Sequence, residues 1–164
     1  MILPVPNRQS LAPDMMQKEK LLSIANGQKQ IIQSSVVIAV LGDLEANKNT
    51  EIVYDAAVEA GLIPNEVRDR LAAQIADYYQ DPQFARDSAF SNAGLFAMQL
   101  MLTAKALGYD TCPMVGYNQE QFVKSFNVPA RYAPVMLICV GLAAKAGRPS
   151  NRLPLGQFAV FNPF

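Results

Sequence analysis

The segment Pro113-Met114-Val115-Gly116 places two apolar residues between a proline and a glycine, which a plain connector rarely needs. Because glycine has no side chain, the backbone N–H groups around Gly116 are open to a flat ligand at close range. A tight connection between a strand and a helix would use the same residues. The segment therefore predicts either a binding site for a planar molecule or a sharp turn, and its residues alone do not separate the two.

A second candidate site lies in the loop "GRPSNRLPL", where Arg148 and Arg152 flank Ser150 and Asn151. A guanidinium group binds phosphate through two parallel hydrogen bonds, and Ser and Asn side chains add further donors. Surface loops also carry arginines that bind no ligand. The loop therefore predicts a phosphate site, with an ordinary solvated loop as the alternative.

The remaining polar residues limit the chemistry that the chain can perform by itself. It contains no histidine, which excludes Ser-His-Asp and Cys-His nucleophilic catalysis and every His-ligated metal site. Cys112 and Cys139 each lie in an apolar, strand-like segment, which favours free buried thiols over a disulfide. Asp43 and Glu45 follow the end of a predicted strand, where they suit either a ligand or a helix cap. If the protein is an enzyme, a bound cofactor has to supply the chemistry.

The composition is that of a globular chain without a strongly charged partner. Of its 164 residues, 51% are hydrophobic and 17% are charged, which suits one domain with a buried core. Lys plus Arg and Asp plus Glu number 14 each, so nothing indicates nucleic acid or an anionic membrane. The longest apolar run, residues 36–41, is too short to span a bilayer, and the N-terminal residues lack a signal-peptide pattern. We therefore expect a cytoplasmic protein that does not enter the membrane.

Hydrophobic patterning predicts one α/β domain over residues 1–164. Runs of β-branched residues such as "SSVVIAVLGD" are typical of strands that are covered on both faces. Apolar residues at steps of three and four are typical of amphipathic helices. We expect an irregular lead-in over 1–13, strands at 34–43, 110–114 and 133–141, helices at 14–25, 49–59, 65–79, 82–107 and 118–126, and an extended tail over 147–164.

The helix predicted at 82–107 carries the strongest signals of the chain. Asp81 suits its N-cap, Pro82 its first position and Gly108 its C-terminal stop. Its second half is apolar nearly all round, so it must be covered on more than one side. We expect the sheet on one side and either a second copy of the chain or further parts of the same chain on the other. Gly94 within the helix indicates close helix packing.

Three segments together resemble the FMN-dependent nitroreductase family, especially its small bacterial members. They are "ANGQKQIIQSSVVIAVLGDLEANK", "YYQDPQFARDSAFSNAGLFAMQLMLTAKALGYDTCPMVGYNQEQFVKSFNVPARYAPVMLICVG" and "GRPSNRLPL". The resemblance extends from about residue 18 to residue 155, and the order and spacing of the segments are more specific than any single motif.

The resemblance implies an α+β fold with a central mixed sheet flanked by helices. It also implies a homodimer in which the long helix packs against its twin and a C-terminal strand, "FAVF" at 158–161, crosses to the partner. FMN would lie at the subunit interface. NADH or NADPH would reduce the flavin, and a small electron-poor acceptor, such as a nitroaromatic or a quinone, would then take the electrons in a ping-pong cycle.

The resemblance also assigns the cofactor-binding residues, while the flavin carries the chemistry and no catalytic side chain or metal is implied. The segment that matches 113–116 runs beside the flavin ring in the family, with backbone amides near the reactive N5 edge. Many relatives have Glu-Gly or Gly-Gly where this chain has Val115-Gly116, so the carboxylate is lost here. The polar residue at the pyrimidine edge matches Asn26, with Gln30 as the rival. The implied set is Asn26, Pro113, Met114, Val115, Gly116, and, at the phosphate, Ser150, Asn151 and Arg152.

The chain departs from the family at its N-terminus. The family begins with a helix, a Ser/Arg segment that grips the FMN phosphate, and a loop of the type Asn-x-Gln-Pro-Trp. Here Asn7-x-Gln9 is followed by Ser10-Leu11. We therefore expect an N-terminally shortened member with weakened flavin affinity, because each charge-assisted hydrogen bond contributes roughly 1.5–3 kcal/mol. The alternative function is a catalytically impaired flavin-binding protein or a remnant dimeric scaffold.

Overall fold

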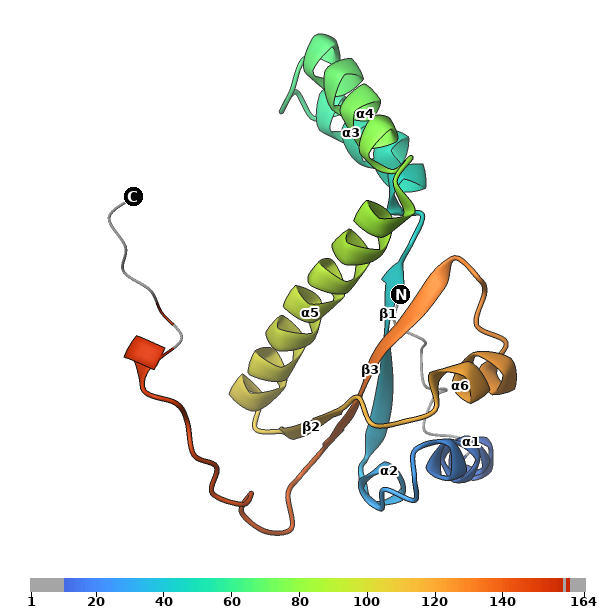
Figure 1. The fold of residues 1–164 in the computed structure, drawn as a ribbon, viewed down its shortest axis with the longest axis vertical. Helices are drawn as coiled ribbons and strands as arrows, with labels where there is room; N and C mark the ends of the chain where they lie inside the picture. The colour runs from blue at the N-terminus through green and yellow to red at the C-terminus, as the bar shows by residue number, and fades with distance from the viewer. Residues whose placement is uncertain (1–10, 158, 160–164) are drawn as a thin grey trace.

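A three-stranded sheet lies between two layers of helices in the computed structural model, which describes residues 11–157 and 159 (Figure 1). The long helix α5 covers one face of the sheet, and α1, α2 and α6 cover the other. The expected helix-flanked sheet is therefore confirmed. In chain order the elements are α1 (Leu11–Ile24), α2 (Gln30–Gln33), β1 (Val36–Asp43), η1 (Ala46–Asn49), α3 (Thr50–Glu59), α4 (Asn65–Tyr78), α5 (Pro82–Ala106), β2 (Asp110–Met114), α6 (Gln119–Phe126), β3 (Tyr132–Gly141) and η2 (Leu155–Gln157).

The strand order is β1-β3-β2, and both pairs are antiparallel. The register between β1 and β3 shifts by one residue where Leu41 pairs with Pro134 instead of Val135. Proline has no N–H for the ladder, so a bulge is where a central strand tolerates it. The mixed sheet that we expected is, over the described residues, an antiparallel one. The predicted strand at 158–161 falls outside the described residues except for Ala159.

Small residues allow α5 to lie close to the sheet. Its buried positions recur every four residues and are all alanine, namely Ala85, Ala89, Ala93 and Ala97. A Cβ atom added at Gly42 of β1 would lie 3.1 Å from the Cβ atom of Ala89. This spacing is tighter than ordinary van der Waals contact, so glycine at that position permits the close approach.

The predicted helix ends are confirmed at most positions. The side chain of Asp81 accepts a hydrogen bond from the N–H of Gln83, Pro82 opens α5, and Gly108 follows with a φ of +86°. The first helix begins at Leu11, three residues earlier than the predicted cap at Asp14. Proline is tolerated in the first turn of a helix because its missing N–H would have no partner there, so Pro13 does not delay the start.

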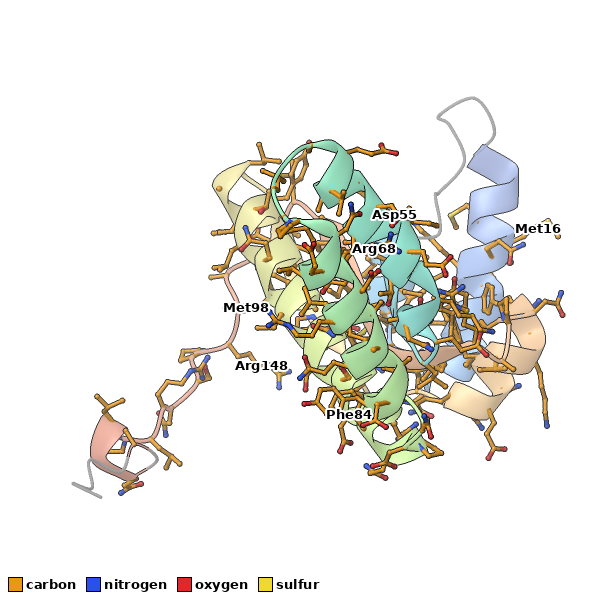
Figure 2. All side chains as sticks on the ribbon, turned by 90° about the horizontal axis from the view of Figure 1, so that it is seen from above. Met16, Asp55, Arg68, Phe84, Met98 and Arg148 are labelled. Carbon is orange, nitrogen blue, oxygen red and sulfur yellow. The ribbon has the colours of Figure 1, made fainter. Side chains whose placement is uncertain are left out.

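Two segments extend away from the sheet (Figure 1). The hairpin of α3 and α4 projects from one end, and Asp55 of α3 lies 3.5 Å from Arg68 of α4 within it (Figure 2). At the other end, the tail after β3 leaves the body of the domain as an extended chain. None of the helices described here combines the length and the apolarity that crossing a membrane requires.

Candidate functional site

The turn between β2 and α6 is held against the end of α1 by two side-chain amides. The carboxamide nitrogens of Asn26 and Gln28 both donate to the carbonyl oxygen of Gly116, each at 3.0 Å. A third bond, from the backbone N–H of Asn118 to the carbonyl oxygen of Ile24, joins the same two segments. One of the predicted site residues, Asn26, is therefore brought to the predicted segment 113–116.

The local sequence explains how both amides reach one carbonyl group. The chain leaves α1 through Asn26 and Gly27, whose φ angles are 54° and 67°. Asparagine and glycine adopt this left-handed conformation at the lowest cost. The N–H of Gly27 donates to the carbonyl oxygen of Leu22 and closes the end of the helix. The reversal places residues two apart, Asn26 and Gln28, on the same side of the turn.

Alternate burial orients the segment itself. Met114 and Tyr117 are 6% and 8% exposed and belong to the core, whereas Val115 between them is 68% exposed. The ring of Tyr117 packs edge-on against Phe122, with 5.7 Å between the ring centroids, and burial raises the pKa of its hydroxyl to about 12. The side chain of Met114 is therefore committed to the core. Only its backbone remains available to a ligand.

Val115 and Gly116 of this turn are both exposed. Neither Val115 N–H nor Gly116 N–H donates to a backbone carbonyl group elsewhere in the described chain, while Tyr117 N–H donates to the carbonyl oxygen of Val115. A Cβ atom added at Gly116 would meet nothing within 4 Å, and the φ angle of Gly116 lies outside the range that favours glycine. Neither packing nor backbone conformation within the chain requires glycine here. The turn thus fits a planar ligand that approaches exposed amide donors.

The predicted phosphate-binding residues lie elsewhere, on the tail that follows β3. Arg152 donates through Nη1 to Ser150 Oγ at 2.6 Å and to the carbonyl oxygen of Asn151 at 3.3 Å. These residues form a local cluster on the tail, which runs away from the turn between β2 and α6 (Figure 1). Within one chain, the predicted phosphate-binding residues 150–152 therefore do not lie beside the segment 113–116 that is predicted to face the flavin ring.

The comparison with protein families decides the relationship. The model of the nitroreductase family matches residues 16–142. The chain belongs to the nitroreductase family. It is 54% identical over 144 residues to the Bacillus subtilis protein named "Putative NAD(P)H nitroreductase YodC", and the match covers 88% of this chain and 71% of YodC. YdgI of the same organism, which has the same description, is 42% identical over 146 residues, with coverage of 87% and 70%.

Solved nitroreductases have the same fold as this chain. A protein from Exiguobacterium sibiricum, crystallised in complex with FMN, superimposes with a TM-score of 0.85 at 40% sequence identity. The match covers 99% of this chain and 76% of that one. The nitroreductase fold of the single chain, as expected from the resemblance, is thereby confirmed, apart from the antiparallel sheet.

The carboxylate of Asp43 has a structural role in this nitroreductase. Its two oxygens accept from Nε and Nη2 of Arg131, both at 2.7 Å, and its Oδ1 also accepts from the backbone N–H of Glu45. Burial raises the pKa of Asp43, but the hydrogen bonds and the positive charge of Arg131 outweigh it, so the pKa is lowered overall. These contacts favour a structural role for Asp43 over the ligand interpretation. The ion pair holds the root of the α3–α4 hairpin against the start of β3.

The sequence alone did not indicate Gln28 at the candidate site or Arg131 at the root of the hairpin. For Gln28, the spacing of two residues from Asn26 across an Asn-Gly turn is a usable sequence signal. Gln30 lies at the start of α2 and is exposed. Arg131 had no local signal, since its partner Asp43 lies 88 residues earlier in the chain.

Proposed function

We propose that the chain is an FMN-dependent NAD(P)H oxidoreductase that reduces nitroaromatic or quinone acceptors by ping-pong hydride transfer. Membership of the nitroreductase family supports this, as do the NAD(P)H in the name of YodC and the FMN in the related crystal structure. The observation that carries the proposal is the turn at Val115 and Gly116. Two amide side chains donate to the carbonyl oxygen of Gly116, while the N–H groups of Val115 and Gly116 donate to no backbone carbonyl group of the described residues.

In this proposal the chain binds and orients the cofactor without a side-chain catalyst. The N–H groups of Val115 and Gly116 donate to the polar edge of the flavin ring, and Gly116 leaves room for the ring to approach. Asn26 and Gln28 act as positioning residues, because they fix the carbonyl group of the same peptide segment. FMN, when bound, supplies the redox chemistry by accepting a hydride from a reduced nicotinamide and passing electrons to the acceptor.

The proposal assigns the FMN phosphate to Ser150, Asn151 and Arg152. Arg152 is exposed on the tail, and its guanidinium is the strongest anion donor among the three. The tail of a single chain lies apart from the turn at Gly116 (Figure 1). We therefore propose that the phosphate group meets this cluster only when the homodimer forms, so that cofactor binding depends on assembly.

The exposed side of α5 supports the homodimer. Leu95, Met98 and Leu102 recur at steps of three and four and are 72%, 53% and 54% exposed. A Cβ atom at Gly94 would meet nothing within 4 Å, so the close packing expected there is not provided by the same chain. Burying large apolar side chains contributes roughly 1.5–3 kcal/mol each. A second copy of the helix would cover this face, and the alternative that α5 is a core helix within the monomer is not favoured.

The absorbance spectrum of the freshly purified protein tests the function. We expect flavin bands at near-stoichiometric occupancy that bleach anaerobically with NADH or NADPH and recover when a nitroaromatic or quinone is added. Flavin bands that do not bleach would favour the catalytically impaired binding protein. A colourless protein that FMN does not titrate would contradict both and leave a remnant scaffold.

A further inference from the structure

The two cysteines of the chain lie directly opposite each other in the sheet. Cys112 of β2 pairs with Cys139 of β3 in the antiparallel register, and both thiols are free. From this juxtaposition we propose that Cys112 and Cys139 are a peroxide-sensitive dithiol that closes to a reversible intramolecular disulfide between β2 and β3. This modification site does not rest on the proposed oxidoreductase function.

The register places the two Cα atoms at a separation that a disulfide can span. Residues directly opposite in an antiparallel pair have their Cα atoms about 4.5 or 5.5 Å apart, depending on the type of pair. Disulfides span Cα distances of roughly 4.4–6.8 Å, so either type of pair permits one. Opposed residues also project to the same face of a sheet. Both cysteines do so here, since Cys112 packs against the same core cluster that contains Cys139.

The two thiols differ in their exposure to solvent, and this difference determines which one reacts first with an oxidant. Cys139 is only 4% exposed, whereas Cys112 is half-buried on an edge strand. Burial raises the pKa of Cys139, which the Ser34 hydroxyl and the Lys18 ammonium group oppose only in part. Lys18 itself is fixed nearby, where its Nζ donates to the carbonyl oxygen of Ser34 at 2.8 Å. Cys112 is therefore the thiol that meets an oxidant first, and Cys139 is the resolving thiol.

With hydrogen peroxide as the oxidant, the disulfide forms in two steps. The sulfur of Cys112 attacks one peroxide oxygen, the O–O bond breaks, and one water leaves as the sulfenic acid forms. The sulfur of Cys139 then attacks that sulfur, the S–O bond breaks, and a second water leaves. The two thiols lose two protons and two electrons in total, and the peroxide takes them up to become two waters. A dithiol reductant reverses the change by thiol–disulfide exchange.

The outcome can be read from the mass of the full chain. Reduced protein is treated with hydrogen peroxide, denatured, alkylated with N-ethylmaleimide and weighed intact. We expect the native sequence to lose the mass of two hydrogens and take up no maleimide, and dithiothreitol to restore two alkylated thiols. Peptide mapping should link the peptide that contains Cys112 to the one that contains Cys139.

Single-cysteine variants provide the matched control. In Cys139→Ser the resolving thiol is absent, so peroxide should convert Cys112 to sulfenic and then sulfinic acid. The native chain should withstand the same treatment without sulfinic acid. Two separate oxidised cysteines in the native chain, a disulfide between two chains, or two thiols that stay unmodified while Cys139→Ser is oxidised would each overturn the proposal. Peptide mapping of the native chain by itself shows whether Cys112 is linked to Cys139. The proposal therefore stays testable even if the variant folds poorly.

Discussion

The side-chain amide of Gln28 lies 3.0 Å from the carbonyl oxygen of Gly116, 88 residues further along the chain. Asn26 donates to the same oxygen at the same distance. A carbonyl oxygen has two lone pairs, so the two donors saturate it. The turn is thereby held in one orientation, with Val115 and Gly116 exposed.

Because the side chains of Asn26 and Gln28 donate to the same carbonyl oxygen, removing either one alone should lower FMN affinity only slightly. We expect Asn26→Ala and Gln28→Ala each to weaken FMN binding less than threefold, and the double variant to weaken it about tenfold or more, since the pair is not additive. Fluorescence titration of FMN measures this. Gln33→Ala, an exposed amide in the same region, is the control. A large loss in Gln30→Ala with none in the double variant would contradict the positioning role and favour Gln30 as the residue at the pyrimidine edge of the flavin.

Gly116→Ala separates ligand binding from stability. The added Cβ atom meets nothing in the chain, so the free energy of unfolding should change by less than about 0.5 kcal/mol. FMN affinity should fall, because the methyl group enters the space proposed for the ring. Gly27→Ala is the matched contrast: its φ of +67° strains any side chain and should destabilise the fold by about 1 kcal/mol. Urea unfolding and FMN titration together give both quantities, and unchanged FMN affinity in Gly116→Ala would argue against the ring placement.

Arg152→Ala addresses the phosphate. Riboflavin has the ring of FMN but no phosphate group, so loss of the guanidinium should weaken FMN binding at least tenfold and leave riboflavin binding within about twofold. Arg148→Ala, four residues earlier on the same exposed tail, is the control. Equal weakening of both flavins would show that Arg152 does not contact the phosphate.

Met98→Lys probes the exposed face of α5, on which Met98 projects away from the sheet (Figure 2). A charge in a helix–helix interface loses its hydration without a partner, so we expect monomers or insoluble protein. Leu100 is less suitable, because it packs against the sheet of its own chain. Sedimentation velocity reads the oligomeric state, with Gln119→Lys on α6 as the surface control. A soluble dimer of unchanged stability would refute the proposed interface.

Asp43→Asn tests the ion pair at the root of the hairpin. The change should lower the free energy of unfolding at neutral pH by about 1–2 kcal/mol, with Asp77→Asn as an exposed control. The folded-state pKa of Asp43 lies below its ordinary value of 3.8. Its contribution is therefore complete above that value and is lost as the pH falls through the lower, folded-state pKa. Urea unfolding of the native chain and of Asp43→Asn across the acid range should show their free energies of unfolding converging at low pH. A constant difference would contradict the role of the charge.

Local signals predicted most of the elements. Asp81, Pro82 and Gly108 bound α5 because capping and backbone conformation depend on residues close together in the chain. Asn118 likewise caps α6, where its side chain accepts a hydrogen bond from the N–H of Gln121. The N–H of Asn118 donates to Ile24 of α1 instead of to the side chain of Gln121, a choice that only the packing of α6 on α1 could make.

By itself, then, the sequence determined where most of the helices and strands lie and which segment could face a planar ligand, since these follow from neighbouring residues. Contacts between distant segments were decided by the tertiary structure alone. The pairing of Gln28 with Gly116, of Arg131 with Asp43 and of Cys112 with Cys139 depends on strand register and on how helices pack on the sheet. Local periodicity carries no information about register between segments, so these relationships appear only once the chain has folded.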